Sequence, residues 1–210
     1  MSEQRVGQSV PPPEVLEPLL EESAARHRHL CPRQILGVRL GLGGLRALGF
    51  LDADWQPRFD NRRKNLLTIV ELAGCGADGI AVATDCRVGA RTLWVEDYGK
   101  VAATLIDVAR DVAVRVAPRV DVRETAQCYA PGARSRWHAY LDAYRVIPDE
   151  ELMTVQAVQL RRAAPDILSR PGVRVDCDRC GEEITNEREI VRDGETLCRA
   201  CAGDSYYLLL

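Results

Sequence analysis

Residues 27–44 read HRHLCPRQILGVRLGLGG, and this stretch indicates a helix with a chemical site at its start. Pro32 suits the first helical position, because the N–H that proline lacks would have no intrahelical partner there. A helix from Pro32 to Leu48, closed by Gly49, would carry a row of glycines on one face: Gly37, Gly41 and Gly44. Each glycine costs about 1 kcal/mol relative to alanine. We therefore expect another backbone to pack closely there; a phosphate-binding loop is a weaker interpretation, since no strand precedes the glycines.

The residues before Pro32 carry chemistry. Two of the chain's three histidines, His27 and His29, precede Cys31. Cys31 falls at the N-cap of the predicted helix, where the helix dipole favours negative charge and should lower the pKa of a thiol. An H-x-C pair can also direct two ligand atoms at one metal ion. At this point two interpretations of these residues remain open. They form a metal or reactive-thiol site, or they are polar neighbours of an ordinary helix start.

The composition argues against several classes of protein. The chain has 210 residues, 46% of them hydrophobic, and a net charge of −3, so nothing recommends nucleic acid or anionic lipid as a partner. It has no apolar run of about 18 residues, and its N-terminal MSEQRVGQSVPPPE lacks the apolar region of a signal peptide. We therefore expect a cytoplasmic protein with no membrane partner. In that compartment eight cysteines indicate metal or thiol chemistry rather than disulfides.

The apolar pattern predicts a mixed core. Helical spacing marks residues 14–29 and 133–145, and a short helix is expected after Cys75. Strands are expected at residues 65–73, 91–95, 101–108, 112–116 and 154–160, with the third and fourth forming a hairpin. Strands and helices mix without a regular βαβ repeat. We therefore predict an α+β fold, with helices packed on an antiparallel-rich sheet and a small C-terminal zinc-binding domain.

The clearest chemistry lies at residues 177–201. Two C-x2-C pairs, seventeen residues apart, have the spacing of a four-cysteine zinc site: Cys177 with Cys180, and Cys198 with Cys201. A hairpin turning at Asp193-Gly194 and a short helix in LCRACAGD would give the layout of a treble clef. Four thiolates leave no open coordination position, so we expect one structural zinc per chain. The finger is net acidic, which makes nucleic acid an unfavourable partner.

These patterns predict four segments. They are a disordered lead (1–13), the α+β core (14–162), a linker rich in proline (163–175), and the zinc finger with the apolar tail YYLLL (176–210). Within the core, Cys75 follows a buried strand, and Asp78 lies one helical turn further on. Cys86 also falls at the end of an element, and Cys128 falls in a predicted loop. For all three cysteines the structural alternative is a small buried hydrophobe.

Four motifs follow one another along the core. They are HRHLCPR with Gly37-Val38-Arg39; Glu71 with Cys75 and Asp78; the segment Thr84 to Gly89; and Asp97-Tyr98-Gly99-Lys100. In this order they resemble the FmdE family of formylmethanofuran dehydrogenase proteins, over about residues 14–160. Many members also carry a C-terminal treble-clef zinc finger. The resemblance implies an α+β core, a homodimer and a site lined by histidine and cysteine.

The resemblance also implies site residues. His29, Cys31 and Cys75 would bind a second metal ion, with His27 and Cys86 as further candidates, and the catalytic candidates are Cys31, Asp78 and Lys100. Soft thiolate and imidazole ligands suit zinc, copper(I) or iron–sulfur sites. The chain departs from the family pattern at Arg33, Ala81, Asp85, Arg87 and Ala90, which indicates a changed substrate or a lost activity.

Three functions follow, in this order of preference. The first is a metal-binding accessory protein that docks to a molybdenum or tungsten oxidoreductase of the formylmethanofuran or formate dehydrogenase type. The second is a metal- or thiol-dependent enzyme acting on a small molecule through Cys31, His29 and Cys75, with Asp78 as acid or base and Lys100 as an anion contact. The third, a nucleic-acid-binding zinc-finger protein, is disfavoured by charge. The accessory role ranks first because these residues complete no set of nucleophile, base and orienting group.

Overall fold

The computed structural model describes residues 10–208, which form two compact units, one up to Ala164 and one from Pro165. Residues 1–9 of the predicted lead and the last two residues of the predicted apolar tail lie outside the described range. Within residues 10–208, no helix combines the length and the apolar character needed to cross a membrane.

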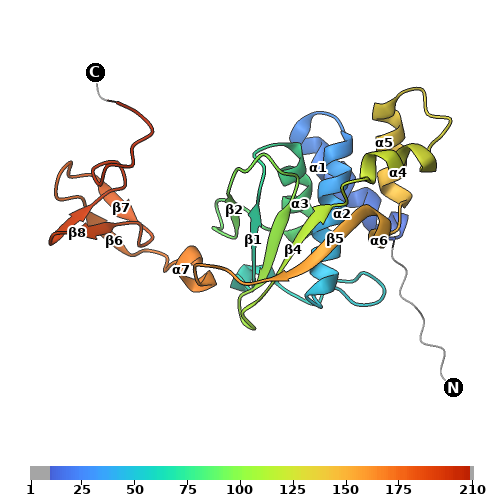
Figure 1. Cartoon of the computed structure of the whole chain (residues 1–210). Helices are drawn as coiled ribbons and strands as arrows, with labels where there is room; N and C mark the ends of the chain where they lie inside the picture. The colour runs from blue at the N-terminus through green and yellow to red at the C-terminus, as the bar shows by residue number, and fades with distance from the viewer. Residues whose placement is uncertain (1–9, 209–210) are drawn as a thin grey trace. The chain divides into compact units, whose positions relative to one another are not determined.

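The first unit packs helices on a five-stranded sheet (Figure 1). Its helices are α1 Pro13–His27, α2 Pro32–Ala47, α3 Cys75–Thr84, α4 Val122–Tyr129, α5 Arg136–Val146 and α6 Asp149–Leu152, with a 3₁₀ turn η1 at Asn61–Arg63. Its strands are β1 Leu66–Val70, β2 Leu93–Val95, β3 Ala103–Asp107, β4 Val112–Pro118 and β5 Met153–Val158. The strand order is β2-β1-β3-β4-β5, and only the β1–β2 pair is parallel. This confirms the predicted α+β fold with an antiparallel-rich sheet.

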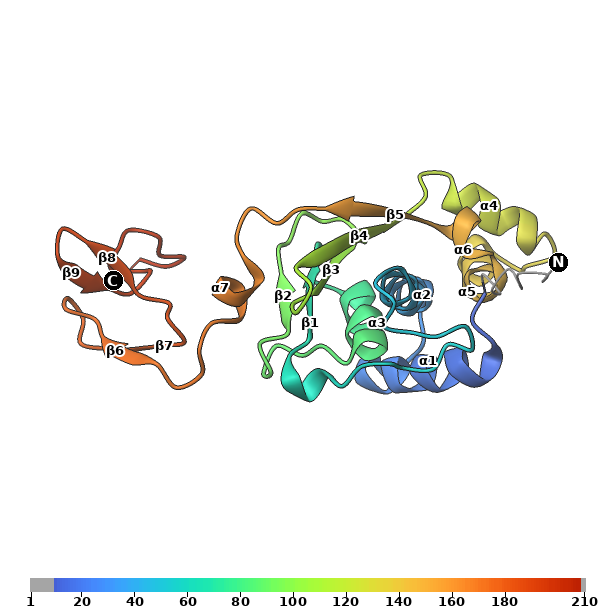
Figure 2. The same cartoon turned by 90° about the horizontal axis from the view of Figure 1, so that it is seen from below.

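Helix α2 lies at the centre of the first unit, and Figure 2 shows it end on, with α1, α3 and α5 around it. Its glycines lack side chains, so neighbouring elements can approach this helix closely. A methyl group on Gly37 would lie 2.3 Å from the carbonyl oxygen of Gly76, and one on Gly41 would lie 2.7 Å from the Cβ of Ala83. Gly44 approaches a leucine of β3 in the same way. The predicted close packing is confirmed. The residue numbers of these contacts increase together, from Gly37 with Gly76 to Gly41 with Ala83, so α2 and α3 run in the same direction.

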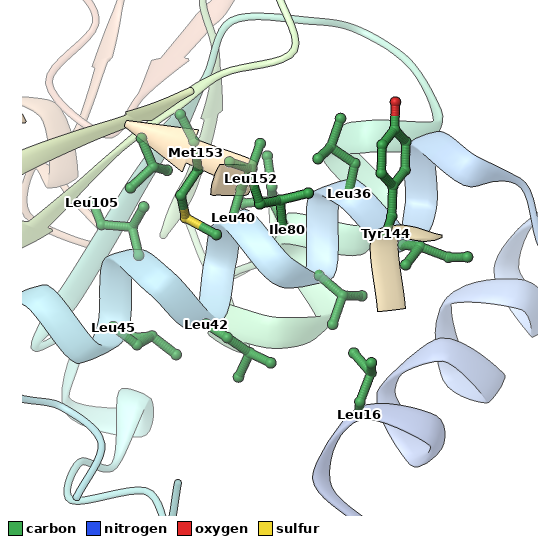
Figure 3. Packing of buried hydrophobic residues seen from close by; sticks show 14 of the residues in the cluster. Leu16, Leu36, Leu40, Leu42, Leu45, Ile80, Leu105, Tyr144, Leu152 and Met153 are labelled. Carbon is green, nitrogen blue, oxygen red and sulfur yellow. The ribbon is translucent and has the colours of Figure 1, made fainter. Parts of the chain in front are cut away.

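Apolar side chains of α2 fill the space between the sheet and the other helices (Figure 3). Leu40, Leu42 and Leu45 belong to one buried cluster with residues of α1, α3, β3 and α6, among them Leu16, Ile80, Leu105 and Leu152. Burying each such side chain contributes about 1.5–3 kcal/mol. The cluster therefore fixes the position of α2 and of the residues at its start.

A buried arginine joins α2 to the end of α5. The Arg39 side chain is inaccessible to solvent, and it donates to the carbonyl oxygens of Tyr144 (2.8 Å) and Ile147 (2.6 Å) and to Oδ1 of Asp149 (2.8 Å). Burial lowers the pKa of Arg39, and the nearby Asp149 carboxylate opposes that shift. This explains the arginine of the Gly-x-Arg motif, which anchors the helix that follows.

The second unit contains two short hairpins after a single-turn helix, α7 Ala164–Leu168, which spans the boundary between the units. One hairpin pairs β6 Arg174–Asp176 with β7 Glu183–Thr185, and the other pairs β8 Ile190–Arg192 with β9 Glu195–Leu197. The second hairpin confirms the turn predicted at Asp193-Gly194. The expected helix in LCRACAGD was wrong: residues 199–203 form turns, because Gly203 at φ +96° ends the helical direction after one turn.

One further sequence prediction was wrong. Cys128 lies in helix α4 and not in a loop. The segment predicted as a linker, residues 163–175, contains α7 and the beginning of β6. Helix α4 buries only Val122 and Ala126, so the sequence there carries little helical periodicity.

Candidate metal and ligand site

Two helices begin side by side, each at a cysteine. Cys31 is the N-cap of α2, and Cys75 is the first residue of α3. Because the glycine contacts hold these helices close and in the same direction, both thiols lie at the same end of the helix pair. Burial, together with the neighbouring Cys31, raises the pKa of the Cys75 thiol. The neutral thiol of Cys75 is therefore favoured until a cation arrives.

His27 adds an imidazole to this pair. It is the last residue of α1, and its Nε2 lies 3.0 Å from Sγ of Cys75. Its Nδ1 is buried and has no hydrogen-bond partner in the part of the chain that the structure describes. The ring of His29 is 5.0 Å away from that of His27, and His29 is exposed. The sequence ranked His29 above His27 as a ligand, but His27 is the histidine in contact with Cys75.

Gln34 fixes Cys31, and sequence reasoning did not single it out. The Cys31 N–H donates to Oε1 of Gln34 at 2.9 Å, and Nε2 of Gln34 donates to the backbone oxygen (2.7 Å) and Oγ (3.1 Å) of Ser23. The first turn of α2 is thereby attached to α1. The signal was present in the sequence, since a side-chain acceptor three residues after an N-cap is the pattern of a capping box.

A cavity of about 830 Å³ opens beside the thiols. His27, His29, Cys31 and Cys75 line one part of it, and Lys100 lines it as well. Aromatic residues of α5 form another part of the wall: Trp137, Tyr140 and Tyr144. The structure thus brings five of the predicted site residues to one cavity.

Glu71 organises the edge of the cavity that carries Lys100. Its carboxylate accepts two hydrogen bonds from Arg115, at 2.6 and 2.7 Å. Its backbone oxygen accepts the N–H groups of Tyr98 and Lys100, both at 3.0 Å. The second and fourth motifs of the sequence therefore meet at one residue, and that residue sets where the Lys100 loop lies.

Two predicted site residues lie elsewhere. Asp78 and Cys86 line a separate cleft of about 510 Å³, which His27 and Cys75 also line. Cys86 is fully buried, and its Sγ accepts hydrogen bonds from Asn61 and Thr68, both at 3.3 Å. Burial raises the pKa of the Cys86 thiol. Cys86 therefore has the surroundings of a structural cysteine.

The finger contains the tightest set of ligand atoms. Among the described residues, its four cysteines are the only group of three or more His, Cys, Asp or Glu residues whose ligand atoms all lie within 4.8 Å of one another: Cys177, Cys180, Cys198 and Cys201. The Cys198 N–H donates to Sγ of Cys177 at 3.3 Å. Such hydrogen bonds lower the pKa of Cys177 to about 6. Four convergent sulfurs, one already inclined to ionise, fit a structural zinc ion.

Known proteins share both parts of the chain. The family model described as "FmdE, Molybdenum formylmethanofuran dehydrogenase operon" matches residues 26–154, and that of the prokaryotic dksA/traR C4-type zinc finger matches residues 171–207. A solved structure from Syntrophus aciditrophicus, of an FmdE-like protein named for a tungsten formylmethanofuran dehydrogenase, has a TM-score of 0.53 and 25% identity. The similarity covers 92% of this chain and 95% of that one.

A curated relative extends beyond this chain. It is a "Probable S-adenosyl-L-methionine-binding protein" of Archaeoglobus fulgidus, 30% identical over 219 residues. The similarity covers 95% of this chain but 56% of the relative, so the chain spans about half of that protein's length. The FmdE match, by contrast, takes in strands β1 to β4, the helices α2 and α3 with Cys31 and Cys75 at their starts, and the aromatic helix α5. With its C4 zinc finger at the C-terminal end, the chain belongs to the FmdE family.

Proposed function

We propose that this is a metal-binding accessory protein whose core holds a soft metal ion between His27, Cys31 and Cys75, in addition to the zinc of the finger. The observation that carries the proposal is the 3.0 Å contact between His27 and Cys75, with Cys31 near enough to the same thiol to raise its pKa. Imidazole and thiolate are the donors that zinc and copper(I) prefer. An ion held by three protein groups would keep one position for a further ligand.

The local structure supports this donor set. His27 Nδ1 is buried without a partner among the described residues, so the imidazole has no other hydrogen bond to hold its orientation. The raised pKa of Cys75 disfavours a free thiolate, whereas a cation in contact with the sulfur favours it. The site also faces a cavity of about 830 Å³, through which an ion and a further ligand can enter.

Metal content per chain tests the proposal. Elemental analysis would follow purification without chelators or a histidine tag, loading with zinc, and desalting. We expect two equivalents in the wild type and one in Cys31→Ser and Cys75→Ser. Cys128→Ser is the matched control, because Cys128 is exposed on α4, and it should keep both. One equivalent in the wild type would contradict a core metal site.

Docking to a molybdenum or tungsten oxidoreductase is the finer part of the proposal. It is supported by the description of the matching family and by the name of the similar S. aciditrophicus protein. Affinity purification of the full chain from its own host should yield a stoichiometric partner containing molybdenum or tungsten. We expect this with the wild type and Cys31→Ser, and its loss with Cys180→Ser, which disables the finger. A chain that elutes without either metal would argue against docking.

The oligomeric state is a separate prediction. Membership of the family implies a homodimer, and light scattering on the purified chain would measure its mass. A mass near twice 23.3 kDa would support the dimer, and a mass near 23.3 kDa would exclude it.

A small-molecule enzyme is the alternative function, and the cavity beside the thiols is the observation that favours it. The name of the A. fulgidus relative suggests S-adenosylmethionine as a ligand. Loss of an activity in Cys31→Ser, with partner binding unchanged, would support the enzyme over the accessory role.

A further inference from the structure

The cavity beside the thiols concentrates positive charge in a chain whose net charge is −3. One carboxylate, Glu124, lines it, against five cationic side chains: Arg33, Lys100, Arg115, Arg119 and Arg123. Arg115 and Arg119 are paired with carboxylates, at 2.6 and 3.3 Å. The other three form no ion pair with any residue of the range 10–208. This excess of unpaired cations would attract an anion.

Another part of the cavity wall offers flat aromatic surfaces. The rings of Tyr140 and Tyr144 are stacked, with centroids 5.7 Å apart and planes inclined by 7°. Trp137 lies one turn earlier on the same face of α5 and is 45% exposed. Arg39 holds the backbone of this helix from within the core. The wall is therefore fixed before any ligand arrives, and its surfaces suit a planar ring.

Tyr144 also presents a polar group to the cavity. Its side chain is 4% exposed, and its hydroxyl makes no hydrogen bond with the described residues. Figure 3 shows the hydroxyl pointing away from the leucine cluster. The hydroxyl is not among the buried unpaired side-chain atoms of the described residues, so it stays accessible and can form a hydrogen bond with a ligand in the cavity.

We infer that the cavity binds a multiply charged anion carrying a planar heteroaromatic ring, of the chemical class of nucleoside diphosphates. The ring would lie against Tyr140 and Trp137, and the charged group would contact Arg33, Lys100 and Arg123, which come from three different elements. This inference rests on the proposed function for the place of the site, but it does not require the metal ion. A sulfonium cation such as S-adenosylmethionine is disfavoured by the same charges.

Calorimetric titration of the full chain with four probes tests the inference. ADP carries the ring and the anion, adenosine only the ring, pyrophosphate only the anion, and S-adenosylmethionine a ring with a cation. We expect ADP to bind at least tenfold more tightly than the other three. Arg123→Gln and Lys100→Gln should each weaken ADP at least fivefold. Arg161→Gln, an exposed arginine outside the cavity, is the matched control and should bind ADP like the wild type.

Cys31→Ser separates this inference from the metal proposal. We expect it to bind ADP within twofold of the wild type, whatever its metal content. Three results would overturn the inference: no ADP binding by the wild type, equal affinities for ADP and adenosine, or loss of ADP in Cys31→Ser while Arg123→Gln still binds it. The last result would place the phosphates on a metal ion and not on the cationic side chains. Lys100, Arg123 and Arg161 are exposed, so thermal melting should show that their variants are folded.

Discussion

The charged Arg39 side chain is fully buried, and hydrogen bonds to three oxygens compensate for its loss of hydration. Two of them are carbonyls at the end of α5, and the third belongs to Asp149, whose pKa burial raises. A pair of this kind adds little net stability compared with a well-packed apolar side chain, but removing one partner leaves the other groups buried and unpaired. Arg39 therefore contributes by holding α5, the helix that carries the aromatic wall, in its position.

We predict that Arg39→Met destabilises the protein by about 3–5 kcal/mol, because two carbonyls and a carboxylate lose their donor in the core. Urea unfolding followed by circular dichroism would measure the change in the free energy of unfolding. Arg161→Met replaces an exposed arginine and should change it by less than about 0.5 kcal/mol. A loss below about 1 kcal/mol in Arg39→Met would show that water reaches these oxygens.

Tyr144 should make stability depend on alkaline pH. Burial raises the pKa of Tyr144 from 10.0 to about 12 in the folded protein. Between these two values the unfolded chain releases the phenolic proton first, so the free energy of unfolding falls as pH rises. The expected loss from this group is about 1.4 kcal/mol at pH 11. Tyr144→Phe removes it, so the difference between wild type and variant should shift by that amount between pH 9 and pH 11.

Tyr98→Phe is the control for this titration, since Tyr98 is 66% exposed. The difference in unfolding free energy between Tyr98→Phe and the wild type should stay constant from pH 9 to pH 11, so the two curves run parallel. If Tyr144→Phe also stays parallel to the wild type, burial does not raise the pKa of Tyr144 in the folded protein.

At the scale of elements, the distance between α2 and α3 decides where the thiols lie. Gly37 faces backbone atoms of α3 and not a side chain that could rotate away. We predict that Gly37→Ala separates the two helices, destabilises the protein by about 2 kcal/mol and weakens metal binding at Cys31 and Cys75. Unfolding in urea and metal content per chain would measure both effects.

Gly89→Ala is the matched control, because a methyl group there meets no atom within 4 Å. It should leave stability within about 0.5 kcal/mol and metal content unchanged. If Gly37→Ala were equally neutral, the close helix contact would not be what positions the two cysteines.

Elements with a strong pattern could be predicted from the sequence, and short ones could not. The glycine face of α2, the β3–β4 hairpin and the helix starting at Cys75 all followed from spacing and turn residues. Helix α4 was missed because it buries only Val122 and Ala126, too few residues to show a period. The contact between His27 and Cys75 could not be read from spacing, because the turn at Arg28, with φ 68°, decides which histidine ring faces Cys75.

At the scale of the whole molecule, the two units depend on different sources of stability. The first has a large buried cluster drawn from α1, α2, α3, α5 and the sheet. Among the described residues of the second unit, 165–208, the buried cluster has four members: Cys177, Ile184, Leu197 and Ala202. So small a core cannot offset the conformational entropy lost on folding, and a structural metal is the usual remedy. The cysteine spacing predicted this zinc site from sequence alone, because metal ligands are a local pattern.

We therefore predict that chelation unfolds the second unit and leaves the first folded. Hydrogen exchange with mass spectrometry would compare the zinc-loaded chain with the chain after treatment with a strong chelator. Protection should disappear from residues 174–203, which include both hairpins, while the amides of α2 and β3 keep theirs. Cys180→Ser should reproduce this loss without chelator, and Cys128→Ser should match the wild type. If protection in α2 disappears together with that in the hairpins, the two units fold as one, and zinc stabilises the whole chain rather than its finger.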